Sequence, residues 1–555
     1  MIEIRNIISN SLKEAIKNLW DTQIEPEISL TEDFTFGDLT SNVAFQLASI
    51  AKNSPRNIAQ QIMQNMDLPE NMITAEIAGP GFINFRFTHE YLHSLVKEII
   101  KKGYDFGALQ TDDRERIQLE YVSANPTGPL NVVSARAAAV GSAMISLMRH
   151  CGYTIEGEYY INDAGNQIRK LQESFIARIR QGIGLEWEIP LDGYRGEYLM
   201  DMAIQYADCC PEEYKRITGV MLEGDEPDLD HAKQWIVKEM TARIEHDLAA
   251  FNVEMDNFFS EKEFRKTGEV EQILRQLESQ GDLFHKEGAV WFDATQYDDS
   301  EDPYVLIKSD GDYAYAAVDI AYHRNKLERG FDRIYDIWGP DHHSHINRMK
   351  AALIALGYEG RFEVIVLQQV NLLDKGEKVV MSKRAGKIIT LNDLVGEVGV
   401  DVARYFFLCR RSEAHLDFDL DLARKQSDEN PVYYIQYAHA RISGILEFAE
   451  NQGFKSDHID EQAIAMLKED EEIELIRKMA TWPWVVAKSA VDMAPHHVCF
   501  YLHDLARLFH PFYNSFRVVG EDKNLTYARV ALCNAIKTNL ALGLNLLGIS
   551  APENM

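Results

Sequence analysis

Two loops of this chain carry residue types that can bind phosphate. The first, residues 125–130, reads Asn-Pro-Thr-Gly-Pro-Leu and stands between a predicted strand and a predicted helix. A loop with glycine and proline at such a junction lets the backbone approach a phosphate at the helix N-terminus, where the helix dipole favours negative charge. The motif is short, so taken alone it also fits an ordinary turn.

The second loop, residues 381–387, reads Met-Ser-Lys-Arg-Ala-Gly-Lys and follows Lys378. Basic side chains on a glycine-containing loop can neutralise the negative charge that builds on a leaving pyrophosphate. One lysine of this set would fit a solvated surface turn. Four basic groups in an ordered string favour a site for a nucleoside triphosphate.

Both loops need a scaffold, and the sequence around them predicts a doubly wound parallel α/β sheet. Strand-like segments, each followed by loop and helix patterns, recur at residues 116–122, 153–160, 333–338 and 361–367. The helix predicted at 132–148 directly follows the first loop, which is the opening unit of a nucleotide-binding fold. Residues of about 170–290 are mostly helical and acidic in pattern, and we interpret them as an insertion into this sheet.

Different patterns flank the sheet on both sides, so we expect three domains. Residues 1–110 combine helical periodicity with two alternating strands in residues 73–87, which predicts an N-terminal α+β domain. Residues 431–555 are nearly all helical in pattern and predict a C-terminal all-α helical bundle. The remaining residues, 111–430, form the predicted catalytic domain with its insertion.

The charge of the chain limits the ways in which it could bind nucleic acid. The 555 residues carry a formal net charge of −30. This argues against coating nucleic acid by bulk attraction, although a local basic groove could still bind it. Residues 1–110 hold 9 basic and 14 acidic groups and residues 431–555 hold 11 and 15, so the middle carries most of the acid.

Cysteine usage and the N-terminal segment indicate the compartment. The six cysteines include no Cys-x-x-Cys pair, which argues against a disulfide framework or a zinc knuckle. Sparse thiols fit a reducing compartment. The N-terminal segment is amphipathic and has no long apolar run of the kind found in signal peptides or membrane spans. We therefore expect a cytoplasmic protein with no membrane partner.

Nine blocks of the chain, taken in order, resemble the class I arginyl-tRNA synthetase family nearly from end to end. They are AGPGFINF (78–85), ANPTGPL (124–130), YINDAGNQ (160–167), DIAYH (319–323), GPDHHSHI (339–346), MSKRAG (381–386), HLDFDLDLA (415–423), NPVYYIQYAHARI (430–442) and LLGISAPENM (546–555). The resemblance implies a Rossmann-like catalytic domain, an N-terminal domain that contacts tRNA and a C-terminal domain that binds the anticodon. It also implies a monomer that activates L-arginine with ATP and Mg²⁺ and transfers it to the 3′ end of tRNA(Arg), with release of AMP and pyrophosphate.

The same resemblance implies a pocket for arginine that is lined by acids. Glu120 and Asp319 match two family positions whose carboxylates would receive the planar fork of the guanidinium group. Tyr315, one helical turn before Asp319, would enclose the ligand, and Asn125 would orient its amino or carboxylate group. Without the resemblance, Tyr315 would be interpreted as a core tyrosine and Asp319 as an exposed acid.

ATP and the reacting phosphates would occupy the two loops and the segment after the strand at 333–338. The resemblance assigns ATP binding to Pro126, Thr127, Gly128, Pro129, Gly339, Asp341, His342 and Lys383. It assigns catalytic roles to Asn131, Ser134, Met381, Ser382, Lys383 and Arg384. The histidine-rich run at 342–345 lacks metal-ligand spacing, so we expect no resident metal and only Mg²⁺ held by ATP.

Two tyrosines on the first helix of the bundle are the candidates for contact with tRNA. Tyr433 and Tyr437 could stack on unpaired bases. Aromatic residues at helical spacing are also typical of core packing, so this pattern leaves both interpretations open.

One departure from the family pattern lies in the catalytic core. Where the class normally shows His-x-Gly-His, this chain has Asn131, Val132, Val133 and Ser134. Asn131 and Ser134 can still donate hydrogen bonds, but a neutral donor is weaker than a charged one. Val133 replaces the glycine that lets adenine lie against bare backbone, and a branched side chain would crowd the base. An inactive paralogue that binds tRNA or arginine is therefore the alternative hypothesis.

Overall fold

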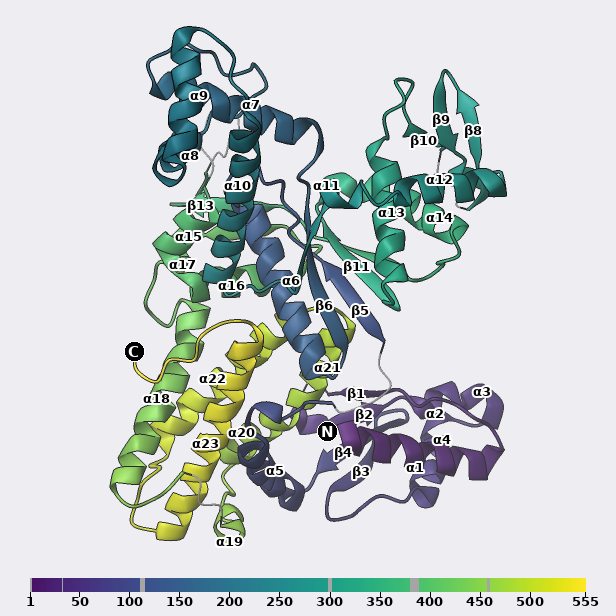
Figure 1. Cartoon of the computed structure of the whole chain (residues 1–555). Helices are drawn as coiled ribbons and strands as arrows, with labels where there is room; N and C mark the ends of the chain where they lie inside the picture. Colours follow the sequence, from purple (N-terminus) through teal and green to yellow (C-terminus); the bar gives the residue numbers. More distant parts are fainter. Residues whose placement is uncertain (1, 32, 110–114, 298–301, 380–388, 457–459) are drawn as a thin grey trace. The chain divides into compact units, whose positions relative to one another are not determined.

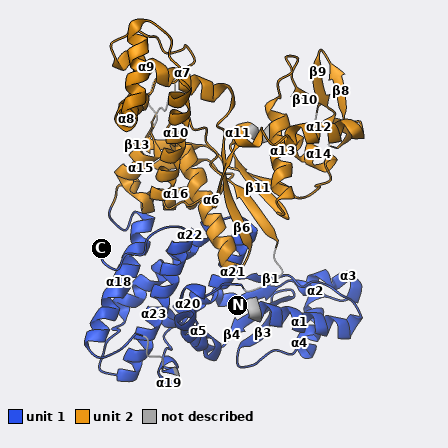
Figure 2. Ribbon diagram, viewed as in Figure 1, with its two compact units in different colours: residues 1–110, 426–555 blue, residues 111–425 orange. Residues whose placement is uncertain are grey.

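The computed structural model describes residues 2–31, 33–109, 115–297, 302–379, 389–456 and 460–555 (Figure 1). Contacts within the chain divide it into two compact units (Figure 2). The first unit joins Met1–Gln110 to Gln426–Met555, and the second is Thr111–Lys425.

A five-stranded parallel sheet, in the order β12-β11-β5-β6-β7, forms the centre of the second unit. Its strands are β5 (Arg116–Glu120), β6 (Thr154–Ile161), β7 (Asn257–Ser260), β11 (Arg333–Trp338) and β12 (Phe362–Val366). The first strand in the chain, β5, lies in the middle, and later strands are added on one side and then on the other. This doubly wound order creates a switch point between β5 and β11, where open α/β sheets bind ligands. The predicted α/β fold is confirmed.

Helix α6 (Val132–His150) packs closely against this sheet because alanines and a glycine occupy the middle of its buried face. At Gly141, an added Cβ would lie 2.3 Å from the ring of Tyr121, so only glycine fits the contact. Among the described helices, α6 alone is long and apolar enough to cross a membrane. Of its apolar window, 72% is buried inside the protein, which is the property of a core helix.

Arg136 ties α6 to the chain segments around β13 (Val370–Asp374) and β15 (Leu416–Asp419). The side chain is fully buried and donates to the carbonyl oxygens of Gln368 at 2.7 Å, Arg411 at 2.9 Å and Ala414 at 3.3 Å. Burial lowers its pKa to about 10, which still leaves the guanidinium charged at neutral pH. One side chain therefore satisfies several carbonyls of two irregular segments.

The segment predicted as a helical insertion, about 170–290, differs in the structure. Helices α7 (Gly165–Gly182), α8 (Tyr198–Cys209), α9 (Pro211–Glu223) and α10 (Asp230–Ala250) share their own apolar core. Strand β7 then returns to the central sheet, so the helical part ends before it. The four residues of β7 pair only with β6, about a hundred positions earlier, and so short a strand leaves no clear periodic signal.

The rest of the second unit completes the surroundings of the sheet. Two small three-stranded sheets follow, β10-β9-β8 and β14-β13-β15. Their strands are β8 (Leu283–Lys286), β9 (Ala289–Phe292), β10 (Tyr304–Ile307), β13, β14 (Glu377–Lys378) and β15. The helices are α11 (Glu261–Phe264), α12 (Glu269–Gln280), α13 (Tyr315–Glu328), α14 (His343–Ala355), α15 (Leu391–Val398), α16 (Val400–Leu408) and α17 (Leu420–Ala423). Helices α12, α13 and α14 contribute to one apolar core with β11 and β12.

The first unit contains both ends of the chain. Its N-terminal part has an antiparallel sheet in the order β1-β2-β4-β3, formed by Ile28–Leu30, Leu39–Ser41, Phe82–Phe87 and Ile73–Ala78. The helices of this part are α1 (Ile2–Trp20), α2 (Val43–Gln46), α3 (Ala48–Ala51), α4 (Pro55–Asn65) and α5 (His89–Lys102). The bundle consists of α18 (Pro431–Asn451), α19 (Glu461–Ile464), α20 (Asp470–Ala480), α21 (Trp482–Val491), α22 (His496–Ser515) and α23 (Lys523–Leu546). The predicted α+β and all-α classes of the two ends are confirmed.

We predict that Arg136→Met destabilises the second unit, because it leaves buried carbonyl oxygens without a donor. The free energy of unfolding should fall by about 3 kcal/mol in urea denaturation. Arg216→Met is the control, because Arg216 makes an exposed ion pair with Glu213 on α9 and should matter little. Equal losses in the two variants would contradict the role given to Arg136.

Candidate active site

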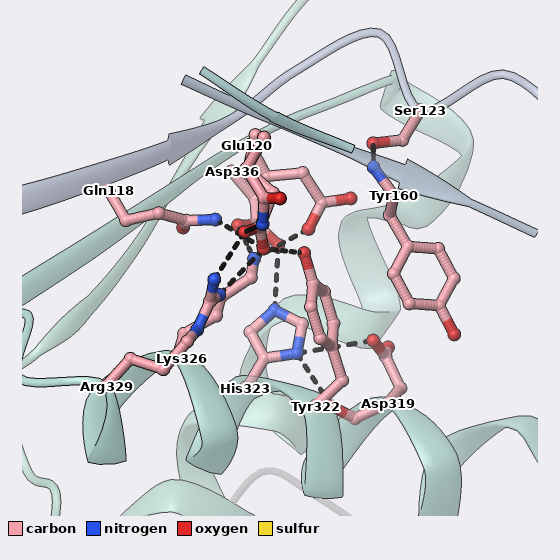
Figure 3. Close-up of polar contacts among 12 residues, drawn as sticks. Gln118, Glu120, Ser123, Tyr160, Asp319, Tyr322, His323, Lys326, Arg329 and Asp336 are labelled. Atoms are coloured by element: carbon pink, nitrogen blue, oxygen red, sulfur yellow. Dashed lines mark hydrogen bonds and ion pairs between the residues drawn. The ribbon is translucent and has the colours of Figure 1, made fainter. Parts of the chain in front are cut away.

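A fully buried lysine lies at the switch point of the sheet. Strands β5 and β11 pair in register, with Glu120 opposite Asp336. Lys326 of α13 reaches both carboxylates, with its Nζ 2.6 Å from Glu120 Oε2 and 2.8 Å from Asp336 Oδ1 (Figure 3). An isolated buried ammonium would be very costly, so these two acids are what allow Lys326 to be there.

His323, which precedes Lys326 on α13, also lies between two acids. Its Nε2 lies 2.8 Å from Asp336 Oδ2, and its Nδ1 lies 2.8 Å from the carbonyl oxygen of Asp319 and 3.3 Å from Asp319 Oδ1. All of these partners are acceptors, so both ring nitrogens must carry a proton and the ring is an imidazolium. His345 of α14 binds the other oxygen of Asp319, with Nε2 to Oδ2 at 2.8 Å, and its ring stacks on Trp338.

The ionisation of these groups follows from their contacts. Burial and Lys326 both favour the neutral form of His323, but Asp336 and Asp319 outweigh them and raise its pKa to about 10. Burial alone would raise the pKa of Asp319, yet His323 and His345 hold that pKa well below its ordinary value. In the same way Lys326 and His323 overcome burial and lower the pKa of Asp336. These acids and His323 are therefore ionised at neutral pH.

Glu120 and Lys326 form the inner end of the network. Burial raises the pKa of the Glu120 carboxyl, and Asp336 adds to that rise, while direct contact with the Lys326 ammonium opposes it. The pKa of Lys326 is raised, because Asp336 and Glu120 outweigh the effect of burial. The lysine is thus a permanent cation, and Glu120 is its ion-pair partner.

Glu158 on β6 is a second buried acid with a full set of donors. Arg329 binds it through two nitrogens, at 2.5 and 2.8 Å, and Tyr322 donates to it at 2.6 Å. Gln118 and Asn257 donate at 2.9 and 2.6 Å. Burial favours the neutral acid, but these partners, Arg329 foremost, keep the pKa of Glu158 below its ordinary value.

The loop after β5 begins with a strained turn. Val122 has φ 70° and Ser123 has φ 36°, a region in which a β-branched residue such as valine is a genuine outlier. The Ser123 hydroxyl accepts a hydrogen bond from the backbone N–H of Tyr160 at 3.0 Å, and the Tyr159 hydroxyl donates to the Ala124 carbonyl at 2.6 Å. These contacts hold the turn that presents Asn125.

The first phosphate loop, residues 125–130, lies directly beyond this turn. It is followed by the altered signature, residues 131–134, which stand in place of the His-x-Gly-His of the class. The Asn125 amide donates to the Gln167 side chain at 2.8 Å, and the Tyr198 hydroxyl donates to the Thr127 carbonyl at 2.5 Å. Asn131 is the N-cap of α6, because its side-chain oxygen accepts from the backbone N–H of Ser134 at 3.0 Å. Asparagine is among the best N-cap residues, which gives this departure from the family pattern a structural reason.

The remaining residues predicted to line the site differ in how exposed they are to solvent. Tyr315 begins α13 and its side chain is 65% exposed, so the interpretation as a core tyrosine is wrong. Val133 is 41% exposed. Gly339 follows β11 with open space beside it, and Asp341 is exposed. Predicted site residues that lie outside the described residues are Met381, Ser382, Lys383 and Arg384, together with the side chain of His342.

The predictions from sequence therefore named two members of this network, Glu120 and Asp319, and missed those that join them. His323 and Lys326 follow Asp319 at positions i+4 and i+7, which puts all three on one face of α13. Charged residues at that spacing next to an acid-bearing strand were the available signal. The strand partner, Asp336, has no such local signal, because its contacts depend on sheet register.

Comparisons with known proteins agree with this fold. A model described as the class I (R) catalytic domain of tRNA synthetases matches residues 95–408. Models of the arginyl-tRNA synthetase N-terminal domain and of the DALR anticodon binding domain match residues 3–87 and 435–555. The parallel sheet, with its site at the switch point, is thus that of a class I aminoacyl-tRNA synthetase.

Relatives over the full length define the family. The arginine–tRNA ligase of Desulforamulus reducens is 42% identical over 561 residues, which cover 100% of this chain and 99% of that protein. That of Oceanobacillus iheyensis is 43% identical over 535 residues, 96% of this chain and 95% of that protein. The arginyl-tRNA synthetase structure of Thermus thermophilus shares the fold over 100% of both chains, with a TM-score of 0.78 at 21% identity. The chain belongs to the arginyl-tRNA synthetase family.

The buried imidazolium leads to a prediction about stability and pH. Because its pKa rises from an ordinary 6.5 to about 10 on folding, His323 contributes stability that is complete below pH 6.5 and disappears as pH rises through 10. The destabilisation of His323→Gln relative to the unmodified chain should therefore be largest below pH 6.5 and shrink toward pH 10. Urea unfolding at several pH values measures it.

The control for this experiment is His246→Gln, since His246 is exposed on α10. It should change the unfolding free energy little at any pH. A loss in His323→Gln that stays constant from pH 6 to 10 would contradict an imidazolium at position 323.

Proposed function

We propose that this chain catalyses the ATP-dependent activation of L-arginine to arginyl-adenylate and transfers arginine to the 3′ end of tRNA(Arg). AMP and pyrophosphate are the other products. The observation that carries the proposal is the position of Glu120 and Asp319, two acids joined in one charged network at the switch point of a nucleotide-binding sheet. The family to which the chain belongs supports the same reaction.

The acids would select arginine by its charge and its shape. A guanidinium offers five donors in one plane and can engage two carboxylates at once, whereas lysine offers a single point charge. Lysine would leave acceptor atoms of the pocket unpaired, which is the kind of loss that gives strong discrimination. In this proposal Asp319 exchanges its contact with His345 for the guanidinium, while Tyr315 covers the ligand and Asn125 orients its amino or carboxylate group.

ATP would lie over the loop of Pro126, Thr127, Gly128 and Pro129, with its phosphates at the N-terminus of α6. Gly339, Asp341 and His342, after β11, would line the adenosine side, since ligands of such sheets bind beyond the carboxyl ends of the strands. Within the described residues, no group of three His, Cys, Asp or Glu side chains could hold a metal ion. Mg²⁺ would therefore enter on the phosphates of ATP and supply positive charge there.

The altered signature would act through two neutral donors. With the Asn131 oxygen capping α6, its amide nitrogen remains to donate toward a phosphate, and the Ser134 hydroxyl stands one turn further along the same helix. The helix N-terminus adds its own preference for anions. Lys383 and Arg384 would supply the positive charge that the missing histidines do not, on the loop that also carries Met381 and Ser382.

The tRNA would be read by the helical bundle. On α18, the rings of Tyr433 and Tyr437 are stacked, with centroids 6.4 Å apart and planes 9° apart. A cleft of about 610 Å³ lies alongside, lined in part by Arg441, Phe448 and Tyr513. The Arg441 guanidinium is 4.9 Å from the Tyr437 ring centroid and 4.6 Å from that of Tyr513. Aromatic and guanidinium planes of this kind favour unpaired bases.

We further propose that the enzyme acts as a monomer in the cytoplasm. None of the six cysteines, all of which lie within the described residues, forms a disulfide bond, which suits a reducing compartment. The family resemblance is the basis for the monomeric state.

The experiment that tests the proposal is charging of tRNA(Arg) from the same organism by the purified chain with ATP, Mg²⁺ and radiolabelled arginine. Stable arginyl-tRNA is the expected product. Tight binding of tRNA or arginine without charging would instead support the inactive paralogue, for which the replaced signature at Asn131, Val133 and Ser134 is the specific observation.

We predict that Asp319→Ala raises the KM for arginine by about 30-fold or more, because the bound guanidinium would lose the carboxylate that balances its charge. The KM for ATP should stay nearly constant. Asp201→Ala, an exposed acid on α8, is the matched control and should leave both values unchanged. An unaltered arginine KM in Asp319→Ala would refute the pocket assignment.

We predict that Tyr437→Ala raises the KM for tRNA by about tenfold, since base stacking on one aromatic ring contributes about 1–3 kcal/mol. The KM for arginine in the same variant is the internal control and should not change. If the tRNA KM stays at the unmodified value while the bundle remains folded, Tyr437 is a packing residue only.

A further inference from the structure

Seven charged side chains around the switch point form one network, which His345 of α14 joins through Asp319. The acids are Glu120, Glu158, Asp319 and Asp336, and the cations are His323, Lys326 and Arg329. Each cation contacts at least one of these acids. The neighbouring acid of α11, Glu261, lies outside the set because Arg265 neutralises it at 2.5 Å.

The charges of this set do not cancel. Lys326 balances Glu120, Arg329 balances Glu158 and His323 balances Asp336. The charged state of His323 rests on geometry, since both of its ring nitrogens face acceptors. Counted without His345, the contact that a ligand would replace, four acids and three cations leave one negative charge, which we place on Asp319.

Asp319 is also the acid of the set that is open to a ligand. Its side chain is 32% exposed, compared with 12% for Glu120, 2% for Glu158 and 1% for Asp336. Its partner on that side is His345, which is itself 29% exposed and lies on another helix. A ligand can therefore replace His345 without disturbing the buried ion pairs.

We infer that Lys326 and His323 are positioning residues that leave the arginine pocket one unbalanced negative charge, which the single positive charge of a guanidinium group would balance. This rests on the proposed function of the pocket. The two cations balance the charges of Glu120 and Asp336, so that the surplus negative charge of the set is that of Asp319. They also hold Asp319 and Glu120 in fixed places, because Lys326 and His323 stand on the same face of α13 and share Asp336.

If the net charge of the set controls binding of arginine, a second substitution that restores this charge should lower an arginine KM that the first substitution has raised. Asp336→Asn removes one negative charge and makes the set neutral, so arginine loses its electrostatic attraction. The KM for arginine should rise at least about tenfold, with a smaller change in kcat. Adding Lys326→Met to this variant removes one positive charge and restores the net charge of −1. The double variant should therefore have a lower arginine KM than Asp336→Asn alone.

A purely structural role for these residues predicts the reverse, because removing a second buried group would add to the damage. An arginine KM in the double variant equal to or above that of Asp336→Asn would overturn the inference. So would an unchanged KM in Asp336→Asn. Lys350→Met is the matched control, since Lys350 pairs with Glu363 at 2.9 Å on the exposed side of the same unit and should leave the KM unchanged.

If circular dichroism shows that Asp336→Asn does not fold, a second pair of variants provides the same test. Glu158→Gln also makes the set neutral and should raise the arginine KM, and adding Arg329→Met should lower it again. The same reversal is expected, and its absence would overturn the inference. Charging by the unmodified chain is measured first, so that failure of the proposed function is distinguished from failure of this charge account.

Discussion

Burial of the Lys326 ammonium is the constraint on which the rest of the site depends. A cation with no exposed surface can exist only where acids surround it, and here one acid comes from each of two neighbouring strands. The ion pairs thereby fix the register of β5 against β11 and the rotation of α13 above them. Since ligands of this fold bind at that point of the sheet, the same contacts that hold the strands together shape the pocket.

From this constraint the chemistry of the pocket follows. His323 must be charged because acceptors surround it, and Asp319 must then be ionised because His323 and His345 both donate to it. The result is a partly exposed acid, Asp319, whose partner His345 lies on a neighbouring helix. In the proposed function, recognition of arginine therefore depends on Lys326 and His323 as well as on the residues that contact the ligand.

Much of this could be predicted from the sequence, because periodicity and ordered motifs are local signals. Strands β5, β6, β11 and β12 were found in this way, and the resemblance located Glu120 and Asp319. Strand β7 was missed because four residues carry too little periodicity, and Asp336 because its partners depend on register between distant strands. The structural role of Asn131 likewise depends on a contact, the cap of α6, that the sequence alone does not define.

In the proposed function, the pocket recognises one planar positive group. Competition by citrulline in the charging reaction is the sharpest experiment, since citrulline has nearly the shape of arginine but a neutral head group. We expect no inhibition by citrulline even in large excess over arginine. Inhibition at concentrations close to the KM for arginine would show that the pocket recognises shape alone, and recognition by charge would then be wrong.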